Sequence, residues 1–153
     1  MLNMADNELI RFSAEVSRIM PDIMRDFLRR QTKEVTEGNI SLPQVLILDV
    51  LKDRASMRMG ELAKYLSVTM AAATGIVDKL VRSGLVTRGS SPDDRRIVNI
   101  SITSGGRRII KKHNEAKQKA FMDIFGHLSA EDRAKYLEIL TKVRQHLKKD
   151  GHS

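Results

Sequence analysis

Hydrophobic residues early in the chain recur every three or four positions. The residues with this spacing are Leu9, Phe12, Val16, Ile19, Met20, Ile23, Met24, Phe27 and Leu28. The pattern predicts an amphipathic helix over residues 6–33. Pro21 lies inside this segment and lacks an amide hydrogen, so we expect a kink or a break near Met20. Either Gly38 or Asn39 is suited to a left-handed cap at the end of the helix.

Three shorter helices are predicted next. The first begins after Ser41, a good N-cap, with Pro43 in its first turn. This segment is apolar nearly all round, as is typical of a central buried helix: Val45, Leu46, Leu48, Val50 and Leu51. Residues 59–66 favour a second helix. Thr69 is predicted to cap a third, which ends at Gly84.

The period of the hydrophobic pattern then changes to two. Residues 85–88 are predicted to form a short strand, and in a second predicted strand Val98, Ile100 and Ile102 alternate with polar residues. Residues 89–96 between them are rich in turn formers and carry charge at the far end. We therefore expect a two-stranded hairpin. It must pack on the helices, because two strands alone are only marginally stable.

The last third of the chain is predicted to be helical again. One helix is expected over residues 104–128. Ser129 is placed to cap a final helix, with Asp132 at the third helical position in a weak capping box. The full order of elements predicts a mainly α (α+β) fold. At 153 residues, we expect a single domain over residues 1–153.

Charge directs attention to a polyanionic partner. The formal net charge is +8 and the pI is about 10.0. This excess favours nucleic acid first and an anionic membrane surface second, with an ordinary solvated basic surface as the alternative. No apolar run approaches the roughly 20 residues that span a bilayer, so we expect no membrane insertion and a cytoplasmic protein.

Several kinds of chemistry lack their residues. The sequence has no cysteine, which excludes disulfides, thiolate nucleophiles and Cys-ligated zinc. It has no Gly-rich phosphate loop, no nucleophile with an adjacent base and no HExxH pattern, so we expect no enzyme and no cofactor. Asp123 and His127 are one helical turn apart, but a metal site needs more than two ligands, so no metal is expected.

The helix pair over residues 60–84 has the connection length of a helix-turn-helix. In such modules the N-terminal half of the second helix faces the base edges. Thr69 and Thr74 can donate hydrogen bonds to phosphates or bases, and Met70 and Ala71 can contact a thymine methyl group. Lys79 follows on the same helix. A plain core role is the alternative for Met70 and for the neighbouring Ala73.

Gly75 lies in the middle of this second helix. A glycine there costs roughly 1 kcal/mol relative to alanine. It permits a close approach of the backbone, either to DNA or to a neighbouring helix.

The hairpin carries charges at both of its ends. Arg88 lies at its base, and Asp94, Arg95 and Arg96 lie at its tip beside Asp93. Acidic and basic neighbours favour an ion pair that fixes one guanidinium while the other points outward. A fixed arginine suits a narrow minor groove. The alternative is a solvated charged loop.

These motifs together resemble the MarR family of winged helix-turn-helix transcription regulators. The family's wing pattern, Asp-x-Arg followed by Leu-Thr, is matched by Asp94, Arg96 and the pair 102–103, where Ile replaces Leu. The family's other patterns fit Ser41–Gln44, Leu66–Thr69, Thr74, Asp78–Leu80 and Gly84–Val86. One departure is Gly75, where many members carry a basic or polar residue that can reach a base.

The resemblance implies a winged helix-turn-helix with long N- and C-terminal dimerisation helices. Residues 5–38 and 104–149 would form the dimerisation region, and residues 41–103 the DNA-binding lobe with a wing over 85–103. It implies a homodimer on palindromic duplex DNA, acting as a repressor and frequently released by a small ligand. The contact residues carried over are Thr69, Met70, Ala71, Thr74 and Lys79 on the recognition helix and Arg88, Asp94, Arg95 and Arg96 on the wing.

The ligand, if one acts, should be a small aromatic or acidic compound, because a thiol switch is excluded. Family members often bind ligands between the dimerisation helices and the DNA-binding lobe. Phe12, Met24 and His113 are candidates to line such a pocket, with ordinary packing as the alternative. A competing interpretation of the whole chain is a basic helical module that binds RNA or a protein partner.

Overall fold

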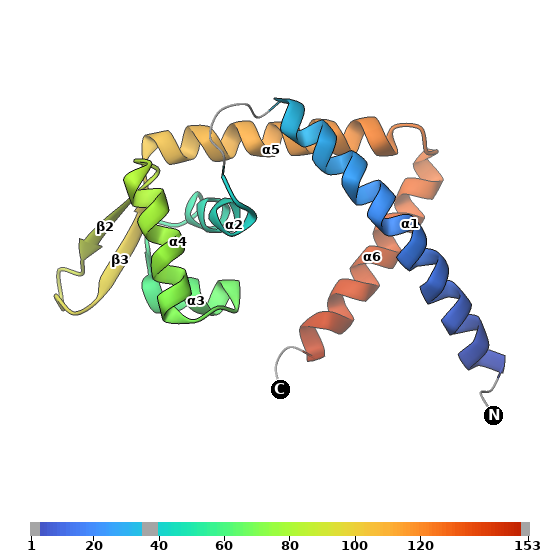
Figure 1. Cartoon of the computed structure of the whole chain (residues 1–153), viewed down its shortest axis with the longest axis horizontal. Coiled ribbons are helices and arrows are strands. Elements are labelled where there is room, and N and C mark those ends of the chain that lie inside the picture. Colours follow the sequence, from blue (N-terminus) through green and yellow to red (C-terminus); the bar gives the residue numbers. More distant parts are fainter. Residues whose placement is uncertain (1–3, 35–39, 151–153) are drawn as a thin grey trace. The chain divides into compact units, whose positions relative to one another are not determined.

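The computed structural model describes residues 4–34 and 40–150 (Figure 1). The chain forms two compact units. One comprises residues 1–31 and 117–153 and is called the helical unit below. The other comprises residues 32–116 and is called the winged unit. Helix α5, Ser104–Phe125, contributes residues to both.

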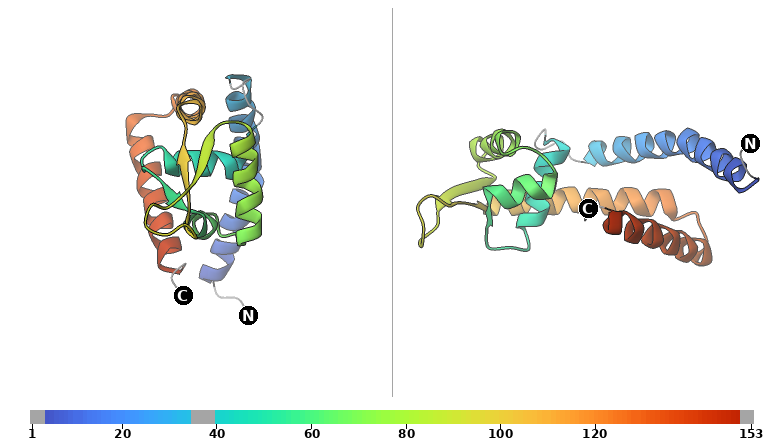
Figure 2. Two further views of the ribbon diagram at one scale, coloured as in Figure 1. Left: turned by 90° about the vertical axis from the view of Figure 1, so that its left-hand side faces the viewer. Right: turned by 90° about the horizontal axis from the view of Figure 1, so that it is seen from below.

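The helical unit contains α1 (Met4–Glu34), the second half of α5 and α6 (Ala130–Asp150). A kink or a break was predicted near Met20; helix α1 runs through Pro21 without a break, so that alternative is wrong. The proline removes only one backbone bond, to a carbonyl on an exposed part of the helix that water can solvate. In the right-hand view of Figure 2 the axis of α1 curves along its length. The cap predicted at Gly38 or Asn39 lies outside the described residues.

Aromatic rings connect the helices of this unit. The ring centroids of Phe27 and Phe121 are 4.7 Å apart, and those of Phe125 and Tyr136 are 5.2 Å apart. These contacts join α1 to α5 and α5 to α6. Ser129 caps α6 as predicted, because its hydroxyl accepts the amide hydrogen of Asp132 at 3.0 Å. Local sequence therefore determines where this last helix begins.

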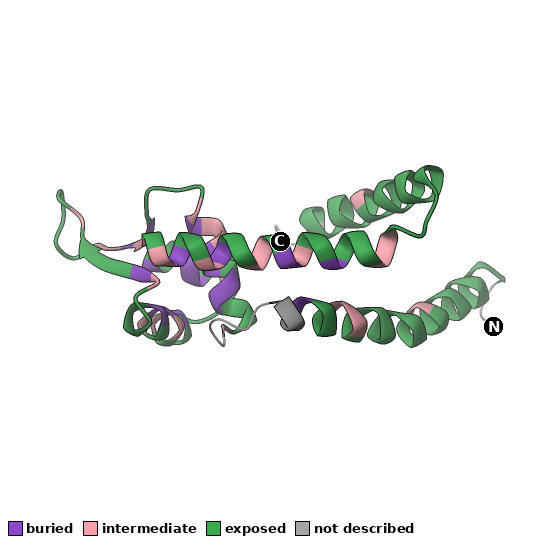
Figure 3. Ribbon diagram, turned by 90° about the horizontal axis from the view of Figure 1, so that it is seen from above, coloured by how far each residue is buried: buried purple, intermediate pink, exposed green. Residues whose placement is uncertain are grey.

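Many large apolar side chains of α1 and α6 remain exposed. Figure 3 shows both helices exposed along most of their length, whereas buried residues concentrate in the winged unit. The exposed side chains are Leu9, Ile10, Phe12, Ile19, Met20, Ile23, Met24 and Leu28 on α1, and Tyr136, Leu137, Ile139, Leu140, Val143 and Leu147 on α6.

The winged unit is built around α2, Leu42–Leu51. Ile47, Leu48 and Leu51 are fully buried, as the apolar pattern of this segment predicts, but Leu46 of the same pattern is 38% exposed. The amide of Ser41 donates to the side-chain oxygen of Gln44 at 2.9 Å and closes the first turn. Helices α3 (Met59–Leu66) and α4 (Met70–Arg82) pack on the same core.

The sheet has three antiparallel strands and not two. Their order is β1 (Met57–Arg58), β3 (Val98–Ile102) and β2 (Val86–Ser90). Met57 pairs with Ile100, and both are buried. The expected hairpin of β2 and β3 is present, with Val86 opposite Ile102. The extra strand has only two residues, too few to produce an alternating pattern in the sequence.

The start of α5 is held against the base of the hairpin. The hydroxyl of Thr103 accepts the amide hydrogen of Gly106 at 3.0 Å and donates to the carbonyl of Gly84 at 2.7 Å. Gly106 is buried so closely that a Cβ there would lie 2.2 Å from the carbonyl oxygen of Leu85. A side chain at this position is therefore incompatible with the packing of α5 on the hairpin.

Candidate nucleic-acid interface

The turn between α3 and α4 is short and well bonded. Ser67 adopts the left-handed conformation, with φ of 55°, and the amide of Val68 donates to the carbonyl of Ala63 at 3.0 Å. Thr69 caps α4 as predicted, because its hydroxyl oxygen accepts the amide hydrogen of Ala72 at 3.1 Å. That bond leaves the hydroxyl proton of Thr69 able to donate to a phosphate.

The N-terminal half of α4 presents mainly small or apolar groups to solvent. Thr69, Ala71 and Lys79 are exposed, and Met70 is 53% exposed and therefore not a core residue. Ala73 is fully buried, as its alternative interpretation predicted. The hydroxyl of Thr74 donates to the carbonyl of Met70 at 2.8 Å, so its proton is engaged within the helix. Thr74 then offers a partner an acceptor rather than a donor.

Gly75 is exposed on α4. A Cβ built on it would have no heavy atom within 4 Å among the residues that were described. Its φ is not positive, so the backbone conformation does not require glycine either. Close packing against another helix among residues 4–34 and 40–150 therefore does not explain why position 75 is a glycine.

Backbone bonds determine the turn at the tip of the wing. The amide of Ser91 donates to the carbonyl of Ile97 at 2.9 Å, and the amide of Ile97 donates to that of Asp94 at 3.0 Å. The carboxylate of Asp94 accepts the amide hydrogen of Arg96 at 2.9 Å. Asp94 therefore shapes the turn from which the arginines project.

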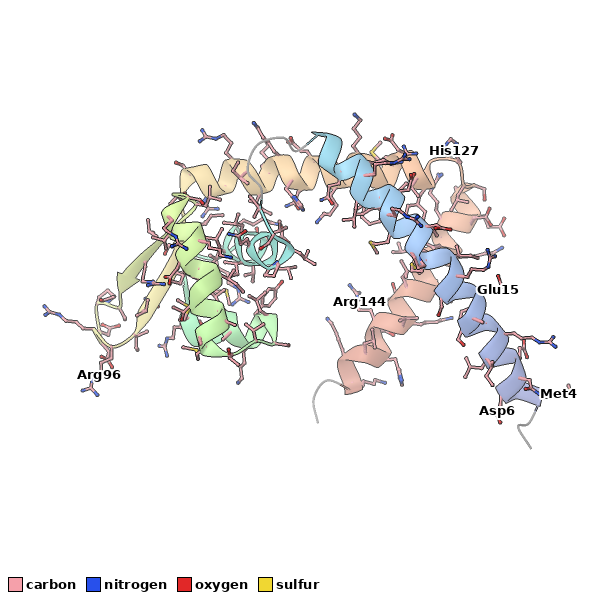
Figure 4. All side chains as sticks on the ribbon, in the orientation of Figure 1. Met4, Asp6, Glu15, Arg96, His127 and Arg144 are labelled. Carbon is pink, nitrogen blue, oxygen red and sulfur yellow. The ribbon has the colours of Figure 1, made fainter. Side chains whose placement is uncertain are left out.

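The guanidinium of Arg96 is almost fully solvated. Its side chain is 95% exposed, and its Nε lies 4.0 Å from the Asp94 carboxylate. Figure 4 shows it extending from the end of the hairpin. The expected ion pair is thus a long contact that does not fix the guanidinium, because the carboxylate is bonded to the backbone instead. Arg95 is also exposed.

Arg88 at the base of the wing has a different environment. Its Nη2 lies 2.5 Å from Oδ1 of Asp78 on α4. The side chains are 38% and 45% exposed, respectively. Arg88 was predicted to contact DNA, and in the free protein it is paired with a carboxylate of the recognition helix.

A polar network that the sequence did not reveal joins α2 to α5. Asp49 Oδ1 accepts hydrogen bonds from Lys52 at 2.7 Å and from the side-chain amide of Asn114 at 2.9 Å. The bond to Asp49 raises the pKa of Lys52 above its ordinary value of 10.5. Arg107 of α5 donates to the carbonyl of Lys52 at 2.6 Å. In the sequence, the only sign of this network was the pair of charged residues Asp49 and Lys52 at the end of a mostly apolar segment.

The three candidate pocket residues belong to different units. Phe12 and Met24 are exposed on α1 in the helical unit, and His113 is half-buried on α5 in the winged unit. The pocket that they were expected to line stays a prediction.

Two further features can be assessed over the described ranges. Among residues 4–34 and 40–150, no group of three or more His, Asp or Glu side chains is placed to hold a metal ion. No helix in those same ranges is both long and apolar enough to cross a membrane.

Comparison with known proteins identifies the family. A sequence model of the MarR family matches residues 40–98. The chain is 32% identical over 106 residues to the multiple antibiotic resistance protein MarR of Escherichia coli K12. The alignment covers 69% of this chain and 74% of that protein. The chain belongs to the MarR family. The family consists of DNA-binding transcription regulators, which is the class that the sequence predicted.

Other MarR-like proteins match over longer stretches. An uncharacterized HTH-type transcriptional regulator of Bacillus subtilis, YpoP, is 28% identical over 116 residues, covering 76% of this chain and 82% of YpoP. The solved structure of a MarR family protein from Bacillus stearothermophilus superposes with a TM-score of 0.76 at 25% identity. That alignment covers 97% of this chain and 99% of the other. The winged helix-turn-helix is thus embedded in the same mainly helical architecture.

Proposed function

We propose that this MarR family regulator binds a palindromic duplex operator as a homodimer and represses transcription, and that a small aromatic or acidic ligand releases it. The observation that carries the DNA-binding part is the arrangement of the winged unit. An exposed, capped helix start at Thr69 and a solvated arginine at Arg96 belong to the same compact unit. A major-groove helix with a cationic wing beside it requires this combination.

The candidate contacts other than Arg88 have the following roles. The hydroxyl of Thr69 and the ammonium of Lys79 bind phosphates, and Met70 and Ala71 contact thymine methyl groups. Thr74 accepts a hydrogen bond. Arg95 and Arg96 enter the minor groove from a turn that Asp94 shapes. The net charge of +8 supports attraction to the duplex.

The homodimer is supported by the apolar residues left exposed on α1 and α6. Contiguous exposed apolar surface on a folded chain usually marks an interaction site. A second copy provides a matching surface through two-fold symmetry. Sedimentation equilibrium should therefore give twice the chain mass of 17.3 kDa. A monomer at micromolar concentration would contradict this part of the proposal.

The remaining parts rest on the family. A repressor released by a ligand at Phe12, Met24 and His113 is proposed from the resemblance and from the absence of cysteine. A cytoplasmic location follows from a DNA target.

The experiment that tests the DNA-binding proposal measures affinity for a duplex selected from random sequences at several salt concentrations. Each phosphate-binding arginine contributes about 0.9 to the slope of log affinity against log salt. We expect Arg95→Ala and Arg96→Ala to weaken binding and reduce the slope. Arg54→Ala is the matched control, since this exposed residue lies outside the candidate DNA contacts and outside the proposed dimer helices.

Two outcomes would contradict the assignment. If neither wing substitution changes affinity, the wing does not contact DNA. If the protein binds single-stranded RNA as tightly as the selected duplex, or more tightly, the interpretation as an RNA-binding module replaces the regulator.

A further inference from the structure

An ion pair joins the wing to the recognition helix. Arg88 on β2 and Asp78 on α4 are ten positions apart in sequence, and their side chains meet at 2.5 Å. Both partners remain partly exposed, on a helix and a strand that the proposed function places against DNA. In a complex with DNA, the phosphates of the duplex would therefore lie close to this ion pair.

The backbone between the two partners is tightly fixed. It passes through the cap of α4, where the amide of Leu85 donates to the carbonyl of Leu80 at 2.9 Å and Gly84 has a φ of 68°. Leu80 and Val86, on either side of that cap, are buried. The ion pair thus joins the two ends of the segment 78–88, and the buried Leu80 and Val86 anchor the middle of that segment in the core. The angle at which the hairpin leaves α4 depends on both anchors.

Arg88 differs from Arg96 of the wing because a carboxylate neutralises its charge at close range. An unpaired Asp78 on the recognition helix would repel DNA phosphates, and Arg88 neutralises it. The pair adds no net charge to the interface. The guanidinium of Arg96, by contrast, is solvated and 4.0 Å from its nearest carboxylate.

We propose that Arg88 is a positioning residue rather than a phosphate contact. Through Asp78 it holds the wing at a fixed angle to α4, so that Arg95 and Arg96 reach the minor groove while α4 lies in the major groove. The inference rests on the proposed function as a reader of duplex DNA, and it reassigns one residue that the sequence placed among the DNA contacts.

The test is a double-mutant cycle on the selected duplex, using Asp78→Ala, Arg88→Gln and the double variant. An exposed pair contributes up to about 1 kcal/mol, so each single substitution should weaken binding by up to about fivefold. The double variant should bind no more weakly than the weaker single variant, because both remove one interaction. The salt slope of the double variant should stay at the wild-type value, because this variant removes one charge of each sign and no phosphate contact.

A direct phosphate contact predicts different results. The double variant would then reduce the salt slope by about 0.9, because it loses a phosphate contact. Asp78→Ala would tighten binding, because it removes a carboxylate that repels the duplex. Either result overturns the positioning role. Arg96→Gln is the matched control, and it should reduce the slope and show no coupling to Asp78→Ala.

A measurement without DNA keeps this inference separate from the proposed function. In the free protein, the guanidinium NMR signals of Arg88 should be protected from exchange and should lose that protection in Asp78→Ala. Unprotected signals in the wild type would contradict the pair itself. A wild-type protein that binds no duplex, with the signals protected, would contradict the proposed function alone.

Discussion

Replacing Gly106 by alanine should destabilise the winged unit. Gly106 lies in the first turn of α5, and a Cβ there would meet the carbonyl oxygen of Leu85 at 2.2 Å and Cγ1 of Ile102 at 2.7 Å. Normal non-bonded contacts are about 3.5 Å. The oxygen belongs to the backbone and accepts the amide hydrogen of Thr103 at 3.1 Å, so it cannot turn away. The helix start must instead move by about 1 Å.

The magnitude follows from these contacts. Overpacking of this kind costs about 1–3 kcal/mol, and weakening the bond from Thr103 to Leu85 adds about 1 kcal/mol. Alanine recovers about 1 kcal/mol through its helix propensity. We expect a net loss of about 1–3 kcal/mol for Gly106→Ala.

The neighbouring Gly105 provides a matched control. A Cβ there would have its nearest neighbours at 3.5 Å, which is ordinary contact. Gly105→Ala should therefore be neutral or stabilising by up to about 1 kcal/mol. The two variants differ by one position and have opposite expected signs.

The assay is urea denaturation followed by far-ultraviolet circular dichroism, at one protein concentration because the proposed dimer links stability to concentration. With a slope of about 1–3 kcal/mol/M, a gap of about 2 kcal/mol between the variants moves the midpoint by about 1 M. Equal midpoints, or a higher midpoint for Gly106→Ala, would refute the reasoning about close packing.

Two further predictions concern α4 and α1. Gly75→Ala should raise the free energy of unfolding by about 1 kcal/mol, because alanine favours the helix and no described residue packs on this position. It should weaken binding to the selected duplex if the α4 backbone approaches DNA there. Unchanged or tighter binding would show that a Cβ is tolerated. The hydrogen bond from Arg30 holds the pKa of the Asp26 carboxyl below its ordinary value of 3.8. The ionised Asp26 carboxylate therefore stabilises the fold at pH values above 3.8, and this stabilisation is lost as the pH falls through the lowered pKa. Arg30→Gln should raise the Asp26 pKa in an NMR titration, and an unchanged pKa would contradict this cause.

Features encoded by neighbouring residues could be predicted from the sequence. The caps at Thr69, Gly84 and Ser129 were all predicted, because each depends on bonds within one turn of the chain. The buried α2 and the hairpin likewise follow from local hydrophobic periodicity. The sequence pattern thus predicted most of the winged unit.

Features that depend on distant partners could not be predicted in the same way. Strand β1 exists because Met57 pairs with Ile100, and two residues carry no pattern of their own. The pairing of Arg88 with Asp78 was equally hidden, since ten positions across a helix cap match no regular spacing. At the wing tip, the sequence showed which charges are adjacent but not that Asp94 binds the backbone.

Hydroxyl-radical footprinting on the selected duplex tests the central claim most directly. We expect two-fold symmetric protection of the sugar backbone, with two protected segments about 10 bp apart beside the recognition helices and flanking minor-groove protection that Arg96→Ala abolishes. A single unsymmetrical footprint, or symmetric protection that Arg96→Ala leaves unchanged, would contradict a dimer that reads DNA with paired helices and wings.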